Sequence, residues 1–129
     1  MSFINSTQIQ RYIYLRSIAS TNDYLIEYLS KNNPLQPVCA YTFNQTSGKG
    51  QIGRKWFSDT GKNISLSLLL KFADLPVHQH YHLNKSICLS LLSFVSDLLP
   101  AQDLKIKWPN DIYFKDKKIA GLLIQNQLK

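Results

Sequence analysis

The sequence predicts an α/β (α+β) fold in which a mixed β-sheet is flanked by helices. Two observations predict it. Short β-type runs and two longer amphipathic runs follow one another in the order β-α-β-loop-β-α-β-β-β, which is typical of a layered sheet with helices. The 129 residues are 44% hydrophobic and 18% charged, which is enough apolar material for the core of one globular domain.

The first half of the chain begins with a strand, a helix and a second strand. Residues 11–16 are a short run of β-type residues. Residues 20–33 have apolar residues at helical spacing, and Ser20 with Asp23 forms a capping-box pattern. An Asn-Asn-Pro run ends this helix, and residues 37–44 follow as the next strand.

A third strand and a long helix come after a glycine-rich loop. Residues 63–72 alternate apolar and serine side chains, so we expect the apolar side to face the core. The apolar set is Ile64, Leu66, Leu68 and Leu70, with Ser65 and Ser67 between them. Residues 79–99 repeat apolar residues at three-and-four spacing, which predicts an amphipathic helix that Pro100 ends. Its expected core positions are Leu83, Ile87, Leu91, Phe94, Val95 and Leu98.

Three short strands complete the predicted sheet, at residues 104–108, 111–115 and 118–125. A tight turn at Asp116-Lys117 joins the last two, so we expect them to pair as a hairpin. Nothing in the sequence covers the outer edge of this hairpin, and an open edge attracts another strand. We therefore expect either further strands of the same fold or pairing with a second chain, as in a homodimer.

The charge of the chain favours anionic partners. The formal net charge is +7, from 15 Lys and Arg against 8 Asp and Glu. The excess gathers at residues 49–55 and 105–118, which is more typical of a phosphate pocket than of a nucleic-acid binding stripe. We find no helix-turn-helix pattern and expect no DNA partner, so a nucleic-acid binder is an alternative that the charge alone supports.

Cysteine usage and hydropathy indicate the compartment. Cys39 and Cys88 are far apart and lie in apolar runs, which favours buried, reduced thiols over a disulfide. No run of 18 apolar residues occurs, and residues 1–16 lack the apolar centre of a signal peptide. We expect a cytoplasmic protein without a membrane partner.

The loop at residues 44–58 combines glycines with cations. Its glycines allow the backbone to approach a ligand and to turn several N–H groups toward it, and its cations suit a phosphate. The glycines are Gly48, Gly50 and Gly53, and the cations are Lys49, Arg54 and Lys55. The loop lacks the ending of a Walker motif, and strand-like residues follow it where a Rossmann fingerprint has a helix. Trp56 either stacks on a base or packs in the core, and both interpretations stay open.

A second cluster lies at residues 105–121. Asn110 and Asp111 follow a proline bend between two strands, and Asp111 has the oxygen chemistry to hold Mg²⁺ through water. Lys107 shares a strand face with the lysine two positions before it. Lys118 enters an apolar strand, where it either extends its amine to solvent or is held for a ligand.

Three histidines occur in an H-Q-H-Y-H pattern, at His78, His80 and His82. In a strand the three would share a face and could hold a metal, but at the start of a helix they would not converge. Because a helix is predicted to begin here, we interpret them as a solvated helix entry.

Three separated blocks carry a resemblance to a known family. The blocks are residues 17–23 (SIASTND), 45–58 (QTSGKGQIGRKWFS) and 107–121 (KWPNDIYFKDKKIAG). They resemble the Ser-Thr-Asn segment, the Gly-Arg-Gly-Arg-x-Gly-Arg-x-Trp loop and the Lys-Trp-Pro-Asn-Asp block, running into Lys-hydrophobic-Ala-Gly, of biotin–protein ligases. These enzymes belong to the biotin/lipoate ligase superfamily. The blocks stand in the family's order and span most of the chain.

The resemblance implies a fold and an activity. It implies a class II synthetase-like catalytic domain, with residues 1–129 as its N-terminal part, no DNA-binding domain, and the rest of the sheet and a small C-terminal domain absent. The implied enzyme joins biotin and ATP into biotinyl-5'-AMP and pyrophosphate, then transfers biotin to a lysine of a biotin carboxyl carrier domain. ATP and biotin are thus the expected substrates, with Mg²⁺ as activator and no tightly bound prosthetic group.

The resemblance also implies site residues, position by position. The biotin-binding set is Ser20, Thr21, Asn22, Gln45, Gly48, Lys49, Gly50, Gln51, Lys118 and Gly121. The ATP-binding set is Lys49, Gln51, Arg54, Trp56, Lys107, Asn110, Asp111 and Lys118, with Asp111 as the Mg²⁺ ligand. The catalytic candidates are Lys118, Arg54 and Lys107, since cations can neutralise the charge that develops at phosphorus. We expect the loop to be flexible until ligand arrives, and then to converge with Lys118 on the acyl-phosphate junction.

The chain departs from the family pattern at three positions. Lys49 stands where arginine is common, Gln51 where many members carry an arginine that helps to retain the adenylate, and Gln125 where glutamate is usual. Two alternatives accompany the biotin ligase interpretation. One is a lipoate or octanoyl-protein ligase, against which the Trp-Pro-Asn-Asp block argues. The other is an incomplete, non-catalytic fragment of the ligase.

Overall fold

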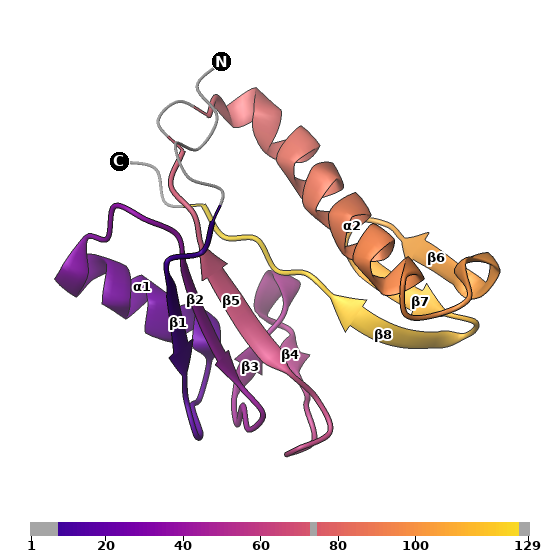
Figure 1. Cartoon of the computed structure of the whole chain (residues 1–129), viewed down its shortest axis with the longest axis horizontal. Coiled ribbons are helices and arrows are strands. Elements are labelled where there is room, and N and C mark those ends of the chain that lie inside the picture. Colours follow the sequence, from indigo (N-terminus) through magenta and orange to yellow (C-terminus); the bar gives the residue numbers. More distant parts are fainter. Residues whose placement is uncertain (1–7, 73–74, 127–129) are drawn as a thin grey trace. The chain divides into compact units, whose positions relative to one another are not determined.

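The computed structural model describes residues 8–72 and 75–126, and the chain divides into two compact units, Met1–Asp74 and Leu75–Lys129 (Figure 1). Each unit combines strands with one longer helix, so the predicted fold class is confirmed. Two differences from the expectation stand out. The chain forms two units where one domain was predicted, and the strands are divided among three small sheets.

The first unit contains the mixed sheet. Its strands are β1 (Arg11–Tyr14), β2 (Val38–Thr42) and β5 (Ser65–Leu69), in the order β1-β2-β5. β1 pairs with β2 in parallel and β2 pairs with β5 antiparallel. The parallel pair needs a crossover, which α1 (Thr21–Asn32) supplies while it packs on β2 and β5 (Figure 1).

Helix α1 begins and ends where its sequence predicts. The Ser20 hydroxyl accepts the Asp23 backbone N–H at 3.2 Å, which confirms Ser20 as the N-cap. The Asp23 carboxylate forms an ion pair with Lys49, with 2.7 Å between Oδ2 and Nζ. In a complete capping box this carboxylate would instead accept the Ser20 backbone N–H. Asn33 adopts a left-handed conformation (φ 41°) after the last turn, and its N–H bonds the Leu29 carbonyl.

The core of the first unit corrects the predicted orientation of β5. Leu25, Val38 and Ala40 are buried, and Ser67 lies opposite Ala40 on the helix-facing side of the sheet. The predicted core positions Ile64, Leu66 and Leu68 are instead 57%, 52% and 47% exposed. Alternation shows that a strand has two faces but does not show which is buried. The Ser67 side can be covered because the Ser67 hydroxyl bonds Thr21, so this partly buried polar group has a partner.

The glycine-rich loop folds into a small ribbon of its own. β3 (Gly48–Lys49) pairs antiparallel with β4 (Lys55–Trp56), and a 3₁₀ turn over Gln51–Gly53 connects them. Ile52 in this turn has φ 53° and ψ 48°, a left-handed conformation that is unusual for a β-branched residue, and it is 97% exposed.

The second unit contains α2 (His80–Ser96) and the antiparallel sheet β6-β7-β8, with β6 at Leu104–Lys107, β7 at Asp111–Phe114 and β8 at Lys117–Gly121. Short 3₁₀ turns precede α2 and β6, at Val77–Gln79 and Ala101–Asp103. α2 packs on β6 and β7 (Figure 1). His78 lies in the 3₁₀ turn before α2, and His80 and His82 lie in the first turn of α2, so the predicted helix entry is confirmed.

The buried face of α2 differs in part from the predicted one. Cys88 and Val95 are buried, seven residues or two turns apart, with Ile112 of β7 fully covered. Phe94 and Leu98 are 61% and 68% exposed, so their predicted core positions are wrong. Phe94 precedes Val95 by about 100° of helical rotation, which takes it off the buried face. The helix is apolar around more of its circumference than one neighbouring sheet covers.

The hairpin of β7 and β8 is confirmed, with a shifted turn. Lys117 lies opposite Phe114, so the two turn residues are Lys115 and Asp116, where Asp116-Lys117 was predicted. Lys115 takes the left-handed conformation (φ 53°) that the tight connection requires. β8 ends at Gly121, four residues before the predicted end of this strand.

Both cysteines are buried free thiols, as predicted. Burial raises the pKa of the Cys39 thiol, and burial together with the Asp111 carboxylate raises that of Cys88. None of the helices in residues 8–72 and 75–126 is long and apolar enough to cross a membrane.

Candidate active site

A polar cluster lies at the beginning of α1, in the first unit. Ser20 and Thr21 are each only 3% exposed. Gln45 Oε1 accepts the Thr21 backbone N–H at 3.0 Å and the Thr21 hydroxyl at 3.3 Å. The Thr21 hydroxyl also lies 2.8 Å from the Ser67 hydroxyl of β5. The Ser-Thr-Asn segment, the start of the glycine loop and β5 therefore meet at this point.

Backbone pairing brings the first two of these segments together. Ile18 and Gln45 form a parallel bridge. The amides of Thr46 and Ser47 donate to the carbonyls of Ile18 and Ala19 at 2.9 and 2.8 Å. The glycine loop thus leaves β2 alongside the residues that lead into α1, so its first turn is fixed by main-chain bonds.

Gly48 is the tightest point of the loop. It is buried opposite Trp56, and a Cβ added there would lie 2.5 Å from Gln45 Nε2 and 2.8 Å from the Trp56 carbonyl oxygen. No side chain fits in that space. Glycine at position 48 therefore allows Gln45 and Trp56 to pack closely against the backbone of the loop. The Trp56 side chain is half-buried.

The rest of the loop is bound to itself and to α1. The Gly50 amide donates to the Arg54 carbonyl at 2.7 Å, and the Arg54 amide to the Gln51 carbonyl at 3.1 Å, so these two N–H groups already have acceptors. Lys49 Nζ lies 2.7 Å from Asp23 Oδ2 in the first turn of α1. Both side chains are about half exposed, so this ion pair is weak, but it places one loop cation over α1.

A second cluster lies on one face of the β6-β7-β8 sheet. Lys118 Nζ lies 2.8 Å from Asp111 Oδ1, and both side chains are partly buried. Lys107 is opposite Asp111 and Tyr113 is opposite Lys118, and directly opposed residues of an antiparallel pair project to the same side. The Lys107 amine lies 5.6 Å from the centre of the Tyr113 ring. The second unit thus brings Lys107, Asp111 and Lys118 together.

Asn110 and Gly121 lie at the edge of this cluster. The Leu122 amide donates to the Asn110 carbonyl at 2.9 Å, and the Asn110 side chain donates back to the Leu122 carbonyl. Gly121 is opposite Asp111 at the end of β8. The Trp108–Pro109 peptide is cis, and the predicted bend between β6 and β7 is confirmed.

The predicted residues divide between the two units. The first contains Ser20, Thr21, Asn22, Gln45, Gly48, Lys49, Gly50, Gln51, Arg54 and Trp56, and the second contains Lys107, Asn110, Asp111, Lys118 and Gly121. Convergence of the loop with Lys118 stays a prediction, because each unit is described by itself. Gln125 follows β8, where strand was predicted.

Sequence reasoning missed two residues of the first cluster. The sequence pattern places Asp23 only in a helix cap, and it places Ser67 on the solvent face of the strand. A serine placed among leucines in a strand was the available signal for Ser67, and only the register with β2 shows that it faces α1.

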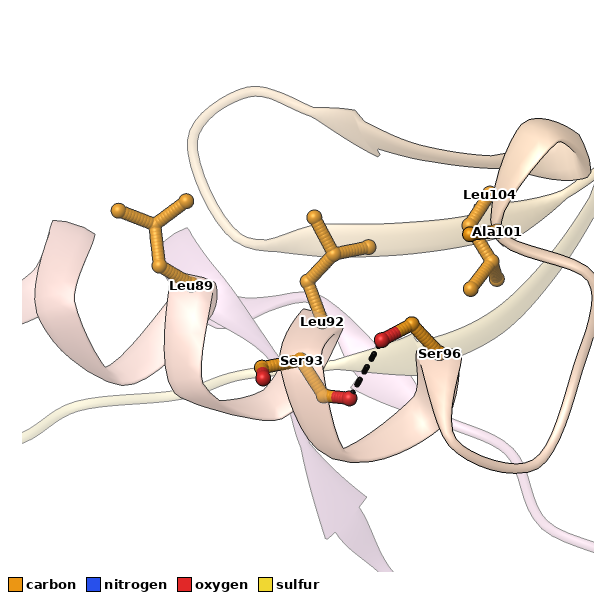
Figure 2. Close-up of a pocket in the computed structure, with 6 residues that line it drawn as sticks. All are labelled: Leu89, Leu92, Ser93, Ser96, Ala101 and Leu104. Carbon is orange, nitrogen blue, oxygen red and sulfur yellow. Dashed lines mark hydrogen bonds between the residues drawn. The ribbon is translucent and has the colours of Figure 1, made fainter.

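A pocket of different character lies in the second unit. Figure 2 shows Leu89, Leu92, Ser93, Ser96, Ala101 and Leu104 around it, with a hydrogen bond from the Ser96 hydroxyl to the Ser93 carbonyl. Its lining is mostly aliphatic, and it contains none of the predicted site residues.

Comparison with known proteins decides the family. Residues 14–129 match the model of the biotin/lipoate A/B protein ligase family. The chain belongs to this family. The chain is similar to the bifunctional ligase/repressor BirA of Escherichia coli, with 33% identity over 109 residues, which cover 84% of this chain and 32% of BirA. The biotin–[acetyl-CoA-carboxylase] ligase of Mycobacterium tuberculosis is 31% identical over 108 residues, covering 82% of this chain and 41% of that ligase.

Solved structures of the family have the same fold. The biotin acetyl coenzyme A carboxylase synthetase of Helicobacter pylori, with bound biotinylated ATP, aligns with a TM-score of 0.69 and 30% identity, over 93% of this chain and 56% of the other. The biotin protein ligase of Aquifex aeolicus, in complex with biotin and ATP, gives a TM-score of 0.60 and 31% identity, over 89% and 46%. This ligase-family chain therefore spans about half the length of these structures.

Proposed function

We propose that this chain supplies part of the active site of a biotin–protein ligase, in which biotin is activated by ATP and then transferred to a lysine of a biotin carboxyl carrier domain. The observation that carries the proposal is the cluster of Lys107, Asp111 and Lys118 on one sheet face. The family membership and the biotin and ATP bound by the Aquifex aeolicus ligase support it.

The proposed reaction has two steps. A biotin carboxylate oxygen attacks the α-phosphorus of ATP, which forms biotinyl-5'-AMP and releases pyrophosphate. The neutral amine of the acceptor lysine then attacks the acyl carbon, which forms an amide and releases AMP together with a proton. The first step brings two anions together, so the site must hold cations where they meet.

The second unit supplies cations for the first step. Lys118 is proposed to lie between the biotin carboxylate and the α-phosphate, and Lys107 to bind phosphate. Their placement on one face of the sheet supports a shared target. In the ligand-free chain Asp111 neutralises Lys118, so binding of the two anionic substrates would redirect the lysine. Asn110 and Gly121 would line the same region.

The first unit is proposed to bind biotin and to cover the adenylate. The cluster of Ser20, Thr21 and Gln45, with Asn22 beside it, would take the polar ring of biotin. The loop would cover the intermediate from water, with Arg54 on phosphate and Trp56 on adenine. Gly48, Lys49, Gly50 and Gln51 would close over biotin, and Gly48 packs directly against Gln45 of the biotin cluster.

Mg²⁺ fits this site as a companion of the nucleotide. In residues 8–72 and 75–126 no group of three His, Cys, Asp or Glu side chains could hold a metal by itself. Asp111 offers one carboxylate, which is enough for Mg²⁺ when substrate phosphates provide further oxygens. The ion would supply charge neutralisation at the phosphates.

Two measurements test the proposal. Isothermal titration should show binding of biotin, and biotin-dependent ATP–pyrophosphate exchange should show adenylate formation. Binding of lipoate but not of biotin would instead establish the lipoate alternative, since the family includes both classes. Exchange by a longer parent chain but not by these 129 residues would establish the incomplete-fragment alternative.

A further inference from the structure

Three lysines surround Tyr113 on one face of the β6-β7-β8 sheet. Tyr113 lies on the central strand, opposite Lys105 of β6 and Lys118 of β8. Lys107 follows on β6, two residues after Lys105, so it projects to the same side. Ile112, the neighbour of Tyr113, is fully buried and belongs to the side that α2 covers. Tyr113 therefore lies in the middle of a cationic face that is turned away from α2.

Two of these lysines contact a carboxylate, and the third contacts a ring. The carboxylate contacts measure 2.8 Å and 3.5 Å between Nζ and Oδ1, in the pairs Lys118–Asp111 and Lys105–Asp116. The Lys107 amine lies 5.6 Å from the centre of the Tyr113 ring, within the range of cation–π attraction. A carboxylate neutralises the lysine that it binds, whereas an aromatic ring has no net charge. The contact with Tyr113 therefore orients Lys107 without adding negative charge beside it.

We propose that Tyr113 is a positioning residue, which holds the Lys107 amine on this face so that it meets a phosphate oxygen of the nucleotide. The proposal rests on the proposed function for its ligand, ATP. A lysine ammonium is carried on a flexible four-carbon stem, and fixing that stem against an anion costs conformational entropy. Because the Tyr113 ring restricts the stem before the anion arrives, less entropy is lost on binding. Tyr113 thereby raises the affinity for phosphate without contacting it.

The chain offers matched variants for the test. Tyr113→Leu removes the ring, and Tyr113→Phe keeps the ring and removes only the hydroxyl. Phe114→Leu is the control, because it removes a ring of the same strand whose centre lies 5.4 Å from another lysine amine, that of Lys115. Lys107→Met removes the cation and keeps a flexible side chain of similar length. Circular dichroism of all the variants establishes that they fold.

The first readout needs no ligand. The ε-CH₂ signals of Lys107 are followed in ¹H–¹³C spectra of the full chain and assigned by their loss in Lys107→Met. The face of an aromatic ring shields the protons above it, so these signals should lie upfield of the ordinary lysine position in the wild type and in Tyr113→Phe. They should return to that position in Tyr113→Leu. Ordinary Lys107 signals in the wild type, or an equal change in Phe114→Leu, would overturn the proposal.

The second readout measures binding by isothermal titration, with MgATP and inorganic pyrophosphate as the probes. Tyr113→Leu should weaken both by about two- to tenfold, the effect of ordering one flexible side chain, and Tyr113→Phe should bind them like the wild type. In the Lys107→Met background, Tyr113→Leu should have no further effect, because the two residues act as a unit. A loss of the same size in that background would show a merely structural role for Tyr113 and would refute the proposal.

The role of Tyr113 and the proposed function fail in different ways. Pyrophosphate binding that depends on Tyr113, in a chain without biotin-dependent ATP–pyrophosphate exchange, would support the role of Tyr113 and contradict the proposed function. Wild-type exchange and wild-type affinity for MgATP in Tyr113→Leu would contradict the role of Tyr113 and support the proposed function. A chain that binds neither phosphate ligand would refute both.

Discussion

Lys118 Nζ lies 2.8 Å from Asp111 Oδ1, and the two residues come from the neighbouring strands β7 and β8. The pair joins the candidate for phosphate stabilisation to the candidate for holding Mg²⁺. Each charge is partly shielded from water, so each needs the other while no substrate is bound. Substrate phosphate would give Lys118 a new negative partner, and Mg²⁺ would give Asp111 a new positive one. We therefore expect this ion pair to separate when the substrates bind.

Lys118→Ala should lower biotin-dependent ATP–pyrophosphate exchange by about tenfold or more, because it removes a cation from the developing negative charge. The fold should persist, since water reaches the exposed part of Asp111. The matched control is Lys117→Ala, one residue away and opposite Phe114. Exchange rates and far-ultraviolet circular dichroism check the pair of variants. Equal exchange by Lys118→Ala and the wild type would remove Lys118 from the mechanism.

Gly48→Ala should destabilise the first unit by about 1–3 kcal/mol, because the added methyl group would overlap Gln45 Nε2 and the Trp56 carbonyl. Gly50→Ala should cost less, since its nearest neighbour is 3.3 Å away. Urea unfolding followed by Trp56 fluorescence, in a Trp108→Phe background, measures both. Equal losses for the two variants would contradict the close packing at Gly48.

Asp23→Asn should loosen the glycine loop, because it removes the carboxylate that holds Lys49 over α1. Tryptic cleavage after Lys49 should become a few-fold faster, and added salt should have the same effect on the wild type. Glu27→Gln is the control, since it breaks another exposed ion pair of the same helix, with Lys31. If Glu27→Gln accelerated cleavage as much, helix stability and not the Lys49 contact would be the cause.

The buried thiols predict a loss of stability in alkali. Burial raises the pKa of Cys39 above its ordinary value of 9.0, so the unfolded chain loses this proton at lower pH than the folded chain does. The contribution of the protonated Cys39 thiol to the free energy of unfolding is complete below pH 9, and it is lost as the pH rises through the pKa of the folded state. The pKa of Cys88 is also raised, so Cys88 makes the free energy of unfolding fall with pH in the same direction.

Urea unfolding between pH 7.5 and 10 measures this slope. Replacement of both cysteines by alanine should flatten the fall in unfolding free energy that begins near pH 9, whatever its effect at neutral pH. A double variant with the wild-type slope would show that other groups control the alkaline transition.

Local signals in the sequence predicted most of the elements. Ser20 caps α1 because a serine hydroxyl placed just before a helix can accept a first-turn amide, and this local interaction could be predicted without the fold. The β7–β8 hairpin followed from a polar turn between two apolar runs, with an error of one residue at Lys115. Biotin-ligase motifs predicted the family, which the comparisons confirm.

The errors concern choices that only tertiary contacts make. Leu66 and Ser67 alternate on β5, and the register with β2 decides that the serine side faces α1. Phe94 and Val95 are adjacent on α2, and the position of one sheet decides which of them is covered. The ion pair of Asp23 with Lys49 joins residues 26 positions apart, so no local pattern could reveal it.

Ile52 gives the glycine loop a built-in reason to rearrange. A left-handed backbone at a β-branched residue raises the free energy of the loop by about 1–3 kcal/mol. Because the Ile52 side chain is almost fully exposed to water, its packing does not offset this strain. A ligand-bound state in which Ile52 returned to an ordinary backbone conformation would recover this energy, and affinity would rise by the same amount without a single added contact. Substitution of Ile52 by glycine would relax the empty loop and remove that advantage.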